Sequence, residues 1–206
     1  VRILLFLLYI PIISLSQPTG RDNSPLSVAS CEDKLFFNLY HTPSAIETQI
    51  YQMETTPDSG VIIIGQIRIG APDNFFDGLI AKHDKNGNTV WSITLDGLWN
   101  QYLSDIERLN DGNYIFTGGF GDNIGYRFFL LKVSPTGTLI WRKDYGIPHP
   151  GENLGKNIVK ENADGSLHIA TQFRQNGLSF SDRLHYIKTD PSGVILFAKF
   201  YTPPNP

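Results

Sequence analysis

Cysteine and charge are both scarce in this sequence. Cys31 is the only cysteine among 206 residues, so no disulfide can form within the chain. Charged residues make up 18% and the formal net charge is −3, which provides no clustered basic surface for a nucleic acid. We therefore expect no nucleic-acid partner. The 19 Gly, the 13 Pro and the many aromatic and β-branched residues favour strands and turns over helices.

Sequence motifs for common chemistries are also missing. The chain has no G-x-S-x-G nucleophile elbow, no G-x-G-x-x-G and no phosphate-binding loop. The glycine-rich segment 118–121 precedes a predicted strand, whereas phosphate binding requires a helix there. No two histidines stand at H-x-x-x-H spacing; the five are His41, His83, His149, His168 and His185. The sequence therefore predicts no catalytic residue, no cofactor and no metal site, and indicates a protein that is not an enzyme.

One segment resembles half of a calcium loop. Residues 84–88, D-K-N-G-N, match the start of an EF-hand motif. Calcium would require further oxygens, including a bidentate Glu at the twelfth position, where this chain has Leu95. The equivalent segments elsewhere begin with Ser134 and Asp190 and lack the other oxygen ligands. We therefore interpret 84–88 as a hairpin turn.

The first 16 residues have the order of a secretory signal peptide. Arg2 precedes an apolar run from Ile3 to Ile13, and Ser14 and Ser16 supply small residues before a cleavage site. The run is too short to cross a bilayer as a helix, so we expect no membrane span after cleavage. A buried first strand is the alternative interpretation of the same run.

Residues 17–34 form a polar leader in this interpretation. Val28-Ala29-Ser30-Cys31 resembles a bacterial lipobox, but a lipobox should follow its apolar core directly, and the polar residues 17–27 intervene. The chain has no internal disulfide and no N-x-S/T site, which is more typical of bacterial export than of eukaryotic secretion. We expect a bacterial protein that is secreted or held at the cell surface.

From residue 35 onward, one pattern recurs three times. Asp58, Asp111 and Asp164 are spaced by 53 residues, and each copy divides into four apolar segments bounded by turn residues. A period near 50 residues is typical of a repeat array. The predicted strands contain 50–53, 61–65 and 79–83 and end near Leu95 in the first copy, contain 106–109, 114–118 and 129–133 and end near Tyr145 in the second, and contain 158–160, 167–171 and 185–189 and end near Tyr201 in the third.

Three residue types recur inside the repeat. Glycines in the last turn predict tight hairpins with a positive φ, and they are Gly87, Gly137 and Gly193. Aromatic residues in the fourth strand predict apolar plugs between neighbouring sheets, and they are Trp91, Trp141 and Phe197. Lysines in the third strand are Lys82, Lys132 and Lys188. Because a catalytic lysine would be needed only once, we expect their stems to cover apolar surface with the ammonium groups at the rim.

The repeat unit D-G-x-Y-I-x-x-G … L-x-K-x-D-x-x-G-x-x-x-W resembles the repeats of secreted bacterial β-propeller proteins. Its G-x-x-x-W part, at 87–91 and 137–141, is also similar to the tryptophan-docking repeat of pyrroloquinoline-quinone-type propellers. The resemblance covers about residues 35 to 201. It implies an all-β fold, a β-propeller of four-stranded antiparallel blades, without specifying a function. The third copy departs from the pattern at His168, Thr171 and Phe197.

This resemblance implies propeller repeats over 35–206, with blades at 46–95, 104–145 and 155–201. Residues 35–45 would be an orphan outer strand, since 36–40 match the end of a fourth strand. Propellers typically have about four to eight blades. We therefore expect about three blades of an incomplete ring, and a chain that is part of a longer protein.

The long, variable connections predict where a ligand would bind, because function usually lies on loops over a rigid scaffold. The candidate residues on this face are Asp77, Trp99, Tyr102, Asp122, Tyr126, Arg127, Arg174 and Arg183. We expect a non-enzymatic binding, adhesion or scaffold module with an unidentified protein or glycan ligand. The alternative is a propeller enzyme, either a quinoprotein dehydrogenase or a carbohydrate-active protein. Glycoside chemistry would require a closed ring to bring loop acids such as Asp77, Asp122 and Asp182 together.

The signal-peptide interpretation makes one direct prediction. Cleavage after Ser16 should leave Gln17 as the first residue of the exported protein, because the small residues at 14 and 16 fit the signal peptidase. N-terminal sequencing of the secreted fraction measures this. An intact N-terminus on protein retained in the cytoplasm would contradict it.

Overall fold

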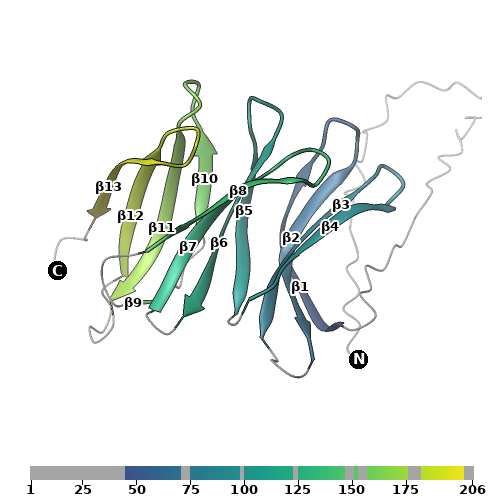
Figure 1. Cartoon of the computed structure of the whole chain (residues 1–206), viewed down its shortest axis with the longest axis horizontal. Helices are drawn as coiled ribbons and strands as arrows, with labels where there is room; N and C mark the ends of the chain where they lie inside the picture. Colours follow the sequence, from purple (N-terminus) through teal and green to yellow (C-terminus); the bar gives the residue numbers. More distant parts are fainter. Residues whose placement is uncertain are drawn as a thin grey trace, which may run out of the picture.

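The fold consists of three antiparallel β-sheets that follow one another along the chain (Figure 1). A computed structural model describes residues 45–70, 75–97, 100–122, 125–146, 151–152, 157–175 and 182–201. No helix occurs in these ranges, and none of the described residues forms a segment able to cross a membrane as a helix. The all-β expectation is therefore confirmed.

Each sheet is a meander in which consecutive strands pair. Sheet 1 contains β1 (Ala45–Thr55), β2 (Val61–Ile69), β3 (Phe76–His83) and β4 (Thr89–Leu95). Sheet 2 contains β5 (Gln101–Arg108), β6 (Tyr114–Asp122), β7 (Gly125–Val133) and β8 (Leu139–Tyr145). Sheet 3 contains β10 (Ile158–Glu161), β11 (Leu167–Gln175), β12 (Asp182–Thr189) and β13 (Ile195–Tyr201), and the short β9 (Gly151–Glu152) pairs with the end of β11.

The twelve long strands lie where the repeat predicted them. The fourth strands end at Leu95, Tyr145 and Tyr201, as expected. Leu109 is one residue beyond the end of β5, because the chain has already entered a turn there. The predicted orphan strand lies outside the described residues, except that Ala45 begins β1. Within the described residues, the sheets form an open row rather than a closed ring (Figure 1).

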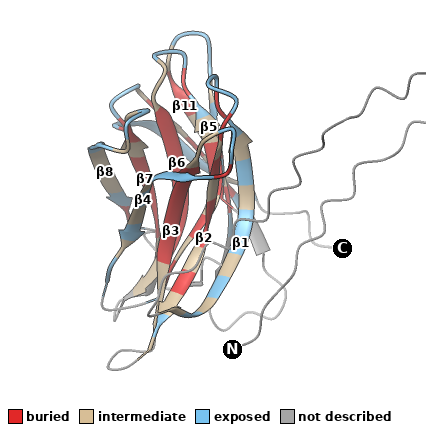
Figure 2. Ribbon diagram, turned by 90° about the vertical axis from the view of Figure 1, so that its right-hand side faces the viewer, coloured by how far each residue is buried: buried red, intermediate tan, exposed pale blue. Residues whose placement is uncertain are grey.

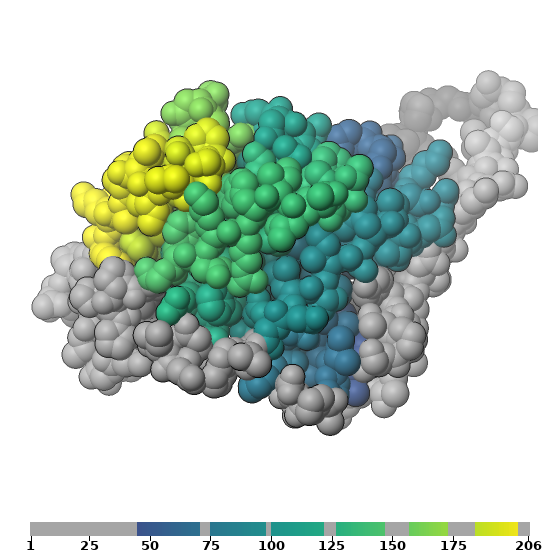
Figure 3. All heavy atoms as spheres, in the orientation of Figure 1, coloured from purple at the N-terminus to yellow at the C-terminus, as the bar shows by residue number. Residues whose placement is uncertain are grey.

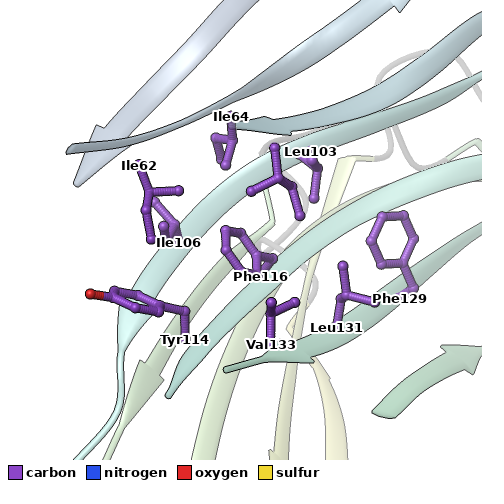
Figure 4. Close-up of a cluster of buried hydrophobic side chains, with 10 residues drawn as sticks. Ile62, Ile64, Leu103, Ile106, Tyr114, Phe116, Phe129, Leu131 and Val133 are labelled. Carbon is purple, nitrogen blue, oxygen red and sulfur yellow. The ribbon is translucent and has the colours of Figure 1, made fainter. Parts of the chain in front are cut away.

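The core lies between neighbouring sheets, because each sheet is apolar on the face that meets its neighbour. Between sheets 1 and 2, the buried side chains are Ile62, Ile64, Ile80, Leu103, Ile106, Tyr114, Phe116, Phe129, Leu131 and Val133 (Figure 4). Between sheets 2 and 3, they are Leu109, Ile115, Phe128, Leu130, Tyr145, Val159, Leu167, Ile169 and Ile187. The second and third strands of sheet 1 are largely buried, whereas β1 at its edge is partly exposed (Figure 2).

The recurring tryptophans join each sheet to the next. The Trp91 indole on β4 donates a hydrogen bond through Nε1 to the Pro135 carbonyl, 3.0 Å away in the β7–β8 turn of sheet 2. Trp141 on β8 also lies against the next sheet, because a Cβ on Gly193 in the β12–β13 turn of sheet 3 would stand 3.2 Å from its ring. The Tyr145 hydroxyl donates to the carbonyl of that glycine at 2.6 Å. The prediction that these tryptophans fill the space between sheets is confirmed.

The turn glycines are required by both backbone and packing. Gly137 has a φ of +83°, which only glycine adopts without a steric cost. A Cβ at that position would also lie 2.8 Å from the Trp91 ring. The tryptophan can therefore approach the turn only because the side chain there is missing.

Phe197 does not fill a gap between sheets, so this part of the prediction is wrong. It occupies on β13 the position that Trp141 occupies on β8, but it is 46% exposed. No further sheet packs against it among the residues that the structure describes.

Two glycine substitutions separate packing from backbone strain. Gly112 has a φ of +84° with open space around its Cβ position, so Gly112→Ala should cost only the left-handed conformation, about 1–2 kcal/mol. Gly137→Ala should cost this and, in addition, about 1–3 kcal/mol for overpacking against Trp91. Urea denaturation of both variants gives the difference. Equal losses of stability would mean that Trp91 does not rest on this turn.

Candidate ligand-binding end of the sheets

The two ends of the sheets are unlike. Tight turns join the first strand to the second and the third to the fourth, and all six lie at one end (Figure 1). They occupy 56–60, 84–88, 109–113, 134–138, 162–166 and 190–194. The opposite end carries the connections between second and third strands and between sheets. We call these the tight-turn end and the loop end.

Side chains close the turns at the tight-turn end. One carboxylate oxygen of Asp84 accepts hydrogen bonds from the backbone N–H groups of Asn86 and Asn88, both at 2.8 Å. Ser134 Oγ and Asp190 Oδ1 accept equivalent bonds in their own turns. The prediction of a hairpin turn at 84–88 is confirmed. Within the described residues, no group of three or more His, Cys, Asp or Glu side chains is placed to hold a metal ion.

The repeated lysines form ion pairs with the repeated aspartates. Lys82 pairs with Asp58, Lys132 with Asp111 at 2.6 Å, and Lys188 with Asp164 at 3.5 Å. Each pair connects the first turn of a sheet to its third strand. The sequence predicted ammonium groups at the rim but not their ion pairs with these aspartates. The recurrence of one such Asp and one such Lys in every copy was the signal in the sequence that could have revealed the pairing.

Two of these aspartates have a strongly lowered pKa. The Lys82 ammonium, and then the Thr56 hydroxyl, hold the pKa of Asp58 at about 2. The hydroxyl and backbone N–H of Ser166 are the main groups that hold the pKa of Asp164 at about 2. Because a Lys–Asp pair is found in all three sheets, we interpret these carboxylates as structural rather than catalytic.

A hollow of about 310 Å³ lies at the tight-turn end between sheets 2 and 3. Lys132 and Asp111 line it and bond each other, and Glu161 in its wall accepts a hydrogen bond from the Asn110 N–H at 2.6 Å. The charged groups around it are thus already partnered within the protein. It lies at the opposite end of the sheets from the ligand-binding candidates that the sequence predicted.

The sequence-predicted candidates gather at the loop end. Asp77 lies near the start of β3, Tyr102 near the start of β5, and Arg127 in the first part of β7. Backbone positions place Asp122, Tyr126, Arg174 and Arg183 at the same end of β6, β7, β11 and β12. Trp99 lies outside the described residues. The structure therefore brings seven of the eight to one end, spread over three sheets. It places all seven on strands, so the prediction that they lie in the connections is wrong, because the strands extend to the end of each sheet.

Packing fixes two side chains near this end. The Tyr102 ring lies on Gly119, where a Cβ would stand 2.4 Å from its hydroxyl. The Arg142 guanidinium lies 4.5 Å from the centre of the Phe129 ring and bonds Gln101 at 3.1 Å. Arg142 could not be predicted from the sequence, because the first and third copies have Ser92 and Ala198 at its position and no recurrence marks it.

A buried carboxylate connects all three sheets. Asp105 on β5 accepts a hydrogen bond from Gln52 Nε2 on β1 at 2.7 Å and one from the Val159 N–H on β10 at 2.8 Å. The role of Asp105 could not be predicted from the sequence either. Its equivalents in the other copies are Gln52 and Ile158, so only two of the three positions are polar.

Two substitutions test the role of Asp105. Asp105→Ala would leave two donors without an acceptor, at a cost of about 1–3 kcal/mol for each buried group. Asp105→Asn should cost less, because its oxygen can still accept from Val159 while Gln52 turns its own oxygen toward the new amide. Chemical denaturation compares the two variants. A similar loss in both would show that the buried hydrogen bonds contribute little.

The lowered pKa of Asp58 predicts a pH dependence. Because this pKa is about 2 in the folded protein and about 4 in an unfolded chain, the ion pair stabilises the fold above pH 4. The stabilisation should disappear as the pH falls from 4 to 2. The stability difference between the natural protein and Asp58→Asn, measured at several pH values, should shrink over this interval. A constant difference would contradict the ion pair.

Comparison with known proteins identifies no family. No protein-family model matches the chain, and no curated protein matches it. Among solved structures, it is similar to a crystal structure of a protein of unknown function from Bacteroides caccae, with a TM-score of 0.41 and 9% sequence identity. The match covers 75% of this chain and 61% of that chain, so this chain spans less than two thirds of that protein's length.

Proposed function

We propose that this chain is a secreted or cell-surface β-propeller module that binds a protein or glycan and catalyses no reaction. Three four-stranded meanders that pack in chain order, each through the same positions, support the propeller arrangement. The order of charged, apolar and small residues at the N-terminus supports export. The chain would be one part of a longer protein.

The difference between the two ends of the sheets is the observation that carries the binding proposal. Six tight turns close one end with hydrogen bonds inside each turn. The other end carries the connections between second and third strands and between sheets, together with acidic, basic and aromatic residues from three sheets. Asp77 and Arg127 stand there on strands of neighbouring sheets. A rigid scaffold that presents variable polar loops is the usual form of a binding site.

A non-enzymatic role is supported by the repeated chemistry. Lys132 and Asp111 line the hollow between sheets 2 and 3, yet an equivalent pair occurs in sheets 1 and 3. A catalytic pair would be needed at one place only. We therefore assign these ion pairs to the stability of each sheet.

Binding to arrays of defined glycans and of purified extracellular proteins tests this proposal. Asp77→Ala and Arg127→Ala, at the loop end, should each weaken binding of any ligand found by about tenfold, equivalent to about 1.4 kcal/mol. Lys85→Ala, an exposed substitution at the tight-turn end, is the matched control and should leave binding unchanged. Weaker binding in the control alone would contradict the assignment of the ligand to the loop end. Dehydrogenase activity with added pyrroloquinoline quinone, or release of sugar from a glycan, would contradict the non-enzymatic role.

A further inference from the structure

We propose that the face of sheet 3 that points away from sheet 2 binds a fourth four-stranded sheet built from this same repeat. We call it the outer face, and its central residues are His168, Ala170, Tyr186, Lys188, Phe197 and Tyr201. The strands that carry it lie at one end of the row of sheets (Figure 3). The inference rests on contacts between sheets and is independent of any ligand at the loop end.

The outer face matches the two faces that already bind a sheet. In each sheet, one residue of the second, third and fourth strands stands side by side in a row on the face toward the next sheet. The rows are Ile62–Lys82–Trp91 in sheet 1, Ile115–Lys132–Trp141 in sheet 2 and His168–Lys188–Phe197 in sheet 3. The strand pairing is therefore the same on all three faces.

Positions that are covered on the first two faces are open on the third. The side chains of Lys82 and Lys132 are 10% and 12% exposed, whereas that of Lys188 is 24% exposed. Tyr145 is 8% exposed, whereas its equivalent Tyr201 is 46% exposed. In sheets 1 and 2, these side chains are covered by the neighbouring sheet. The outer face of sheet 3 has the same residue pattern without a sheet to cover it.

The aromatic residues of the outer face define what the fourth sheet must offer. Tyr145 donates its hydroxyl proton to the Gly193 carbonyl, and a Cβ on that glycine would lie 2.9 Å from the Tyr145 oxygen. Tyr201, as its equivalent, requires a turn glycine with a free carbonyl. Phe197 replaces a tryptophan whose N–H would need an acceptor, so no acceptor is required there. The partner is therefore a sheet whose last hairpin has glycine at the turn position.

The polar residues of the outer face do not prevent burial. His168 and Tyr186 replace Ile62 and Ile80 of sheet 1. The His168 Nδ1 and the Tyr186 hydroxyl are hydrogen-bonded to each other at 2.5 Å. Buried polar groups are tolerated when they are paired in this way. A sheet that covers this face need not supply a partner for that bond.

A second copy of this chain is a poorer occupant. It would have to present the last turn of its own sheet 1, in which Gly87 is the equivalent of Gly193. Gly87 is already buried within one chain. We therefore commit to an additional sheet of the repeat rather than to a head-to-tail dimer.

The test extends the full chain with a second copy of residues 147–201 and measures side-chain oxidation by hydroxyl radicals. In the unextended chain, Phe197 and Tyr201 should react rapidly. In the extended chain, both should react several-fold more slowly, at rates close to that of Tyr145. In a second variant of the extended chain, valine replaces the glycine of the added copy that corresponds to Gly193. Rapid oxidation of Phe197 and Tyr201 should return, because the valine Cβ would collide with the Tyr201 ring.

Amide hydrogen exchange in the added sheet shows independently whether that sheet has folded. The proposal would be overturned if the added sheet folded while Phe197 and Tyr201 stayed fully reactive. It would also be overturned if the added sheet did not fold next to the outer face. Protection of Phe197 in the unextended chain that grows with protein concentration would assign the face to a second copy and would also overturn it. None of these outcomes bears on the glycan or protein ligand proposed for the loop end.

Discussion

The structure depends on the contact between an aromatic side chain on the fourth strand of one sheet and a glycine turn of the next sheet. Trp91 on Gly137 and Trp141 on Gly193 are two copies of it. A single meander with an apolar face is unstable in water until another layer covers that face. The aromatic contact fixes which sheet does so and in what register, because the ring fits only where the turn has no Cβ.

Other interactions act within this frame. The Lys–Asp pairs hold the first turn of each sheet against its third strand. Asp105 connects the first strands of all three sheets through its two hydrogen bonds, to Gln52 and to Val159. Because the sheets are held at fixed positions, their six tight turns collect at one end. The connections between second and third strands and between sheets collect at the other. The proposed binding function follows from that separation.

Features that recur in every copy of the repeat could be predicted from the sequence, whereas features that occur in one copy only could not. The strands, the positive-φ glycines and the tryptophan contacts recur at one spacing, so each copy supports the interpretation of the others. Asp105 and Arg142 are not repeated, and their partners are remote in sequence. The candidate residues could be assigned to the loop end from strand order alone. Their side-chain arrangement could not be predicted, because the residue types at these positions differ between the copies, as at Asp77, Arg127 and Arg183. The predicted role of Trp99 is still a prediction.

The most direct measurement compares the two aromatic residues that share a register but differ in environment. Trp141 contacts the turn of the next sheet, whereas Phe197 is exposed. Equilibrium unfolding of Trp141→Ala should show a loss of about 2–4 kcal/mol, near the range for a large aromatic in a core. Phe197→Ala should lose less than about 1 kcal/mol, as for an exposed position. Equal losses, or a larger loss for Phe197→Ala, would contradict the claim that these contacts hold the sheets together.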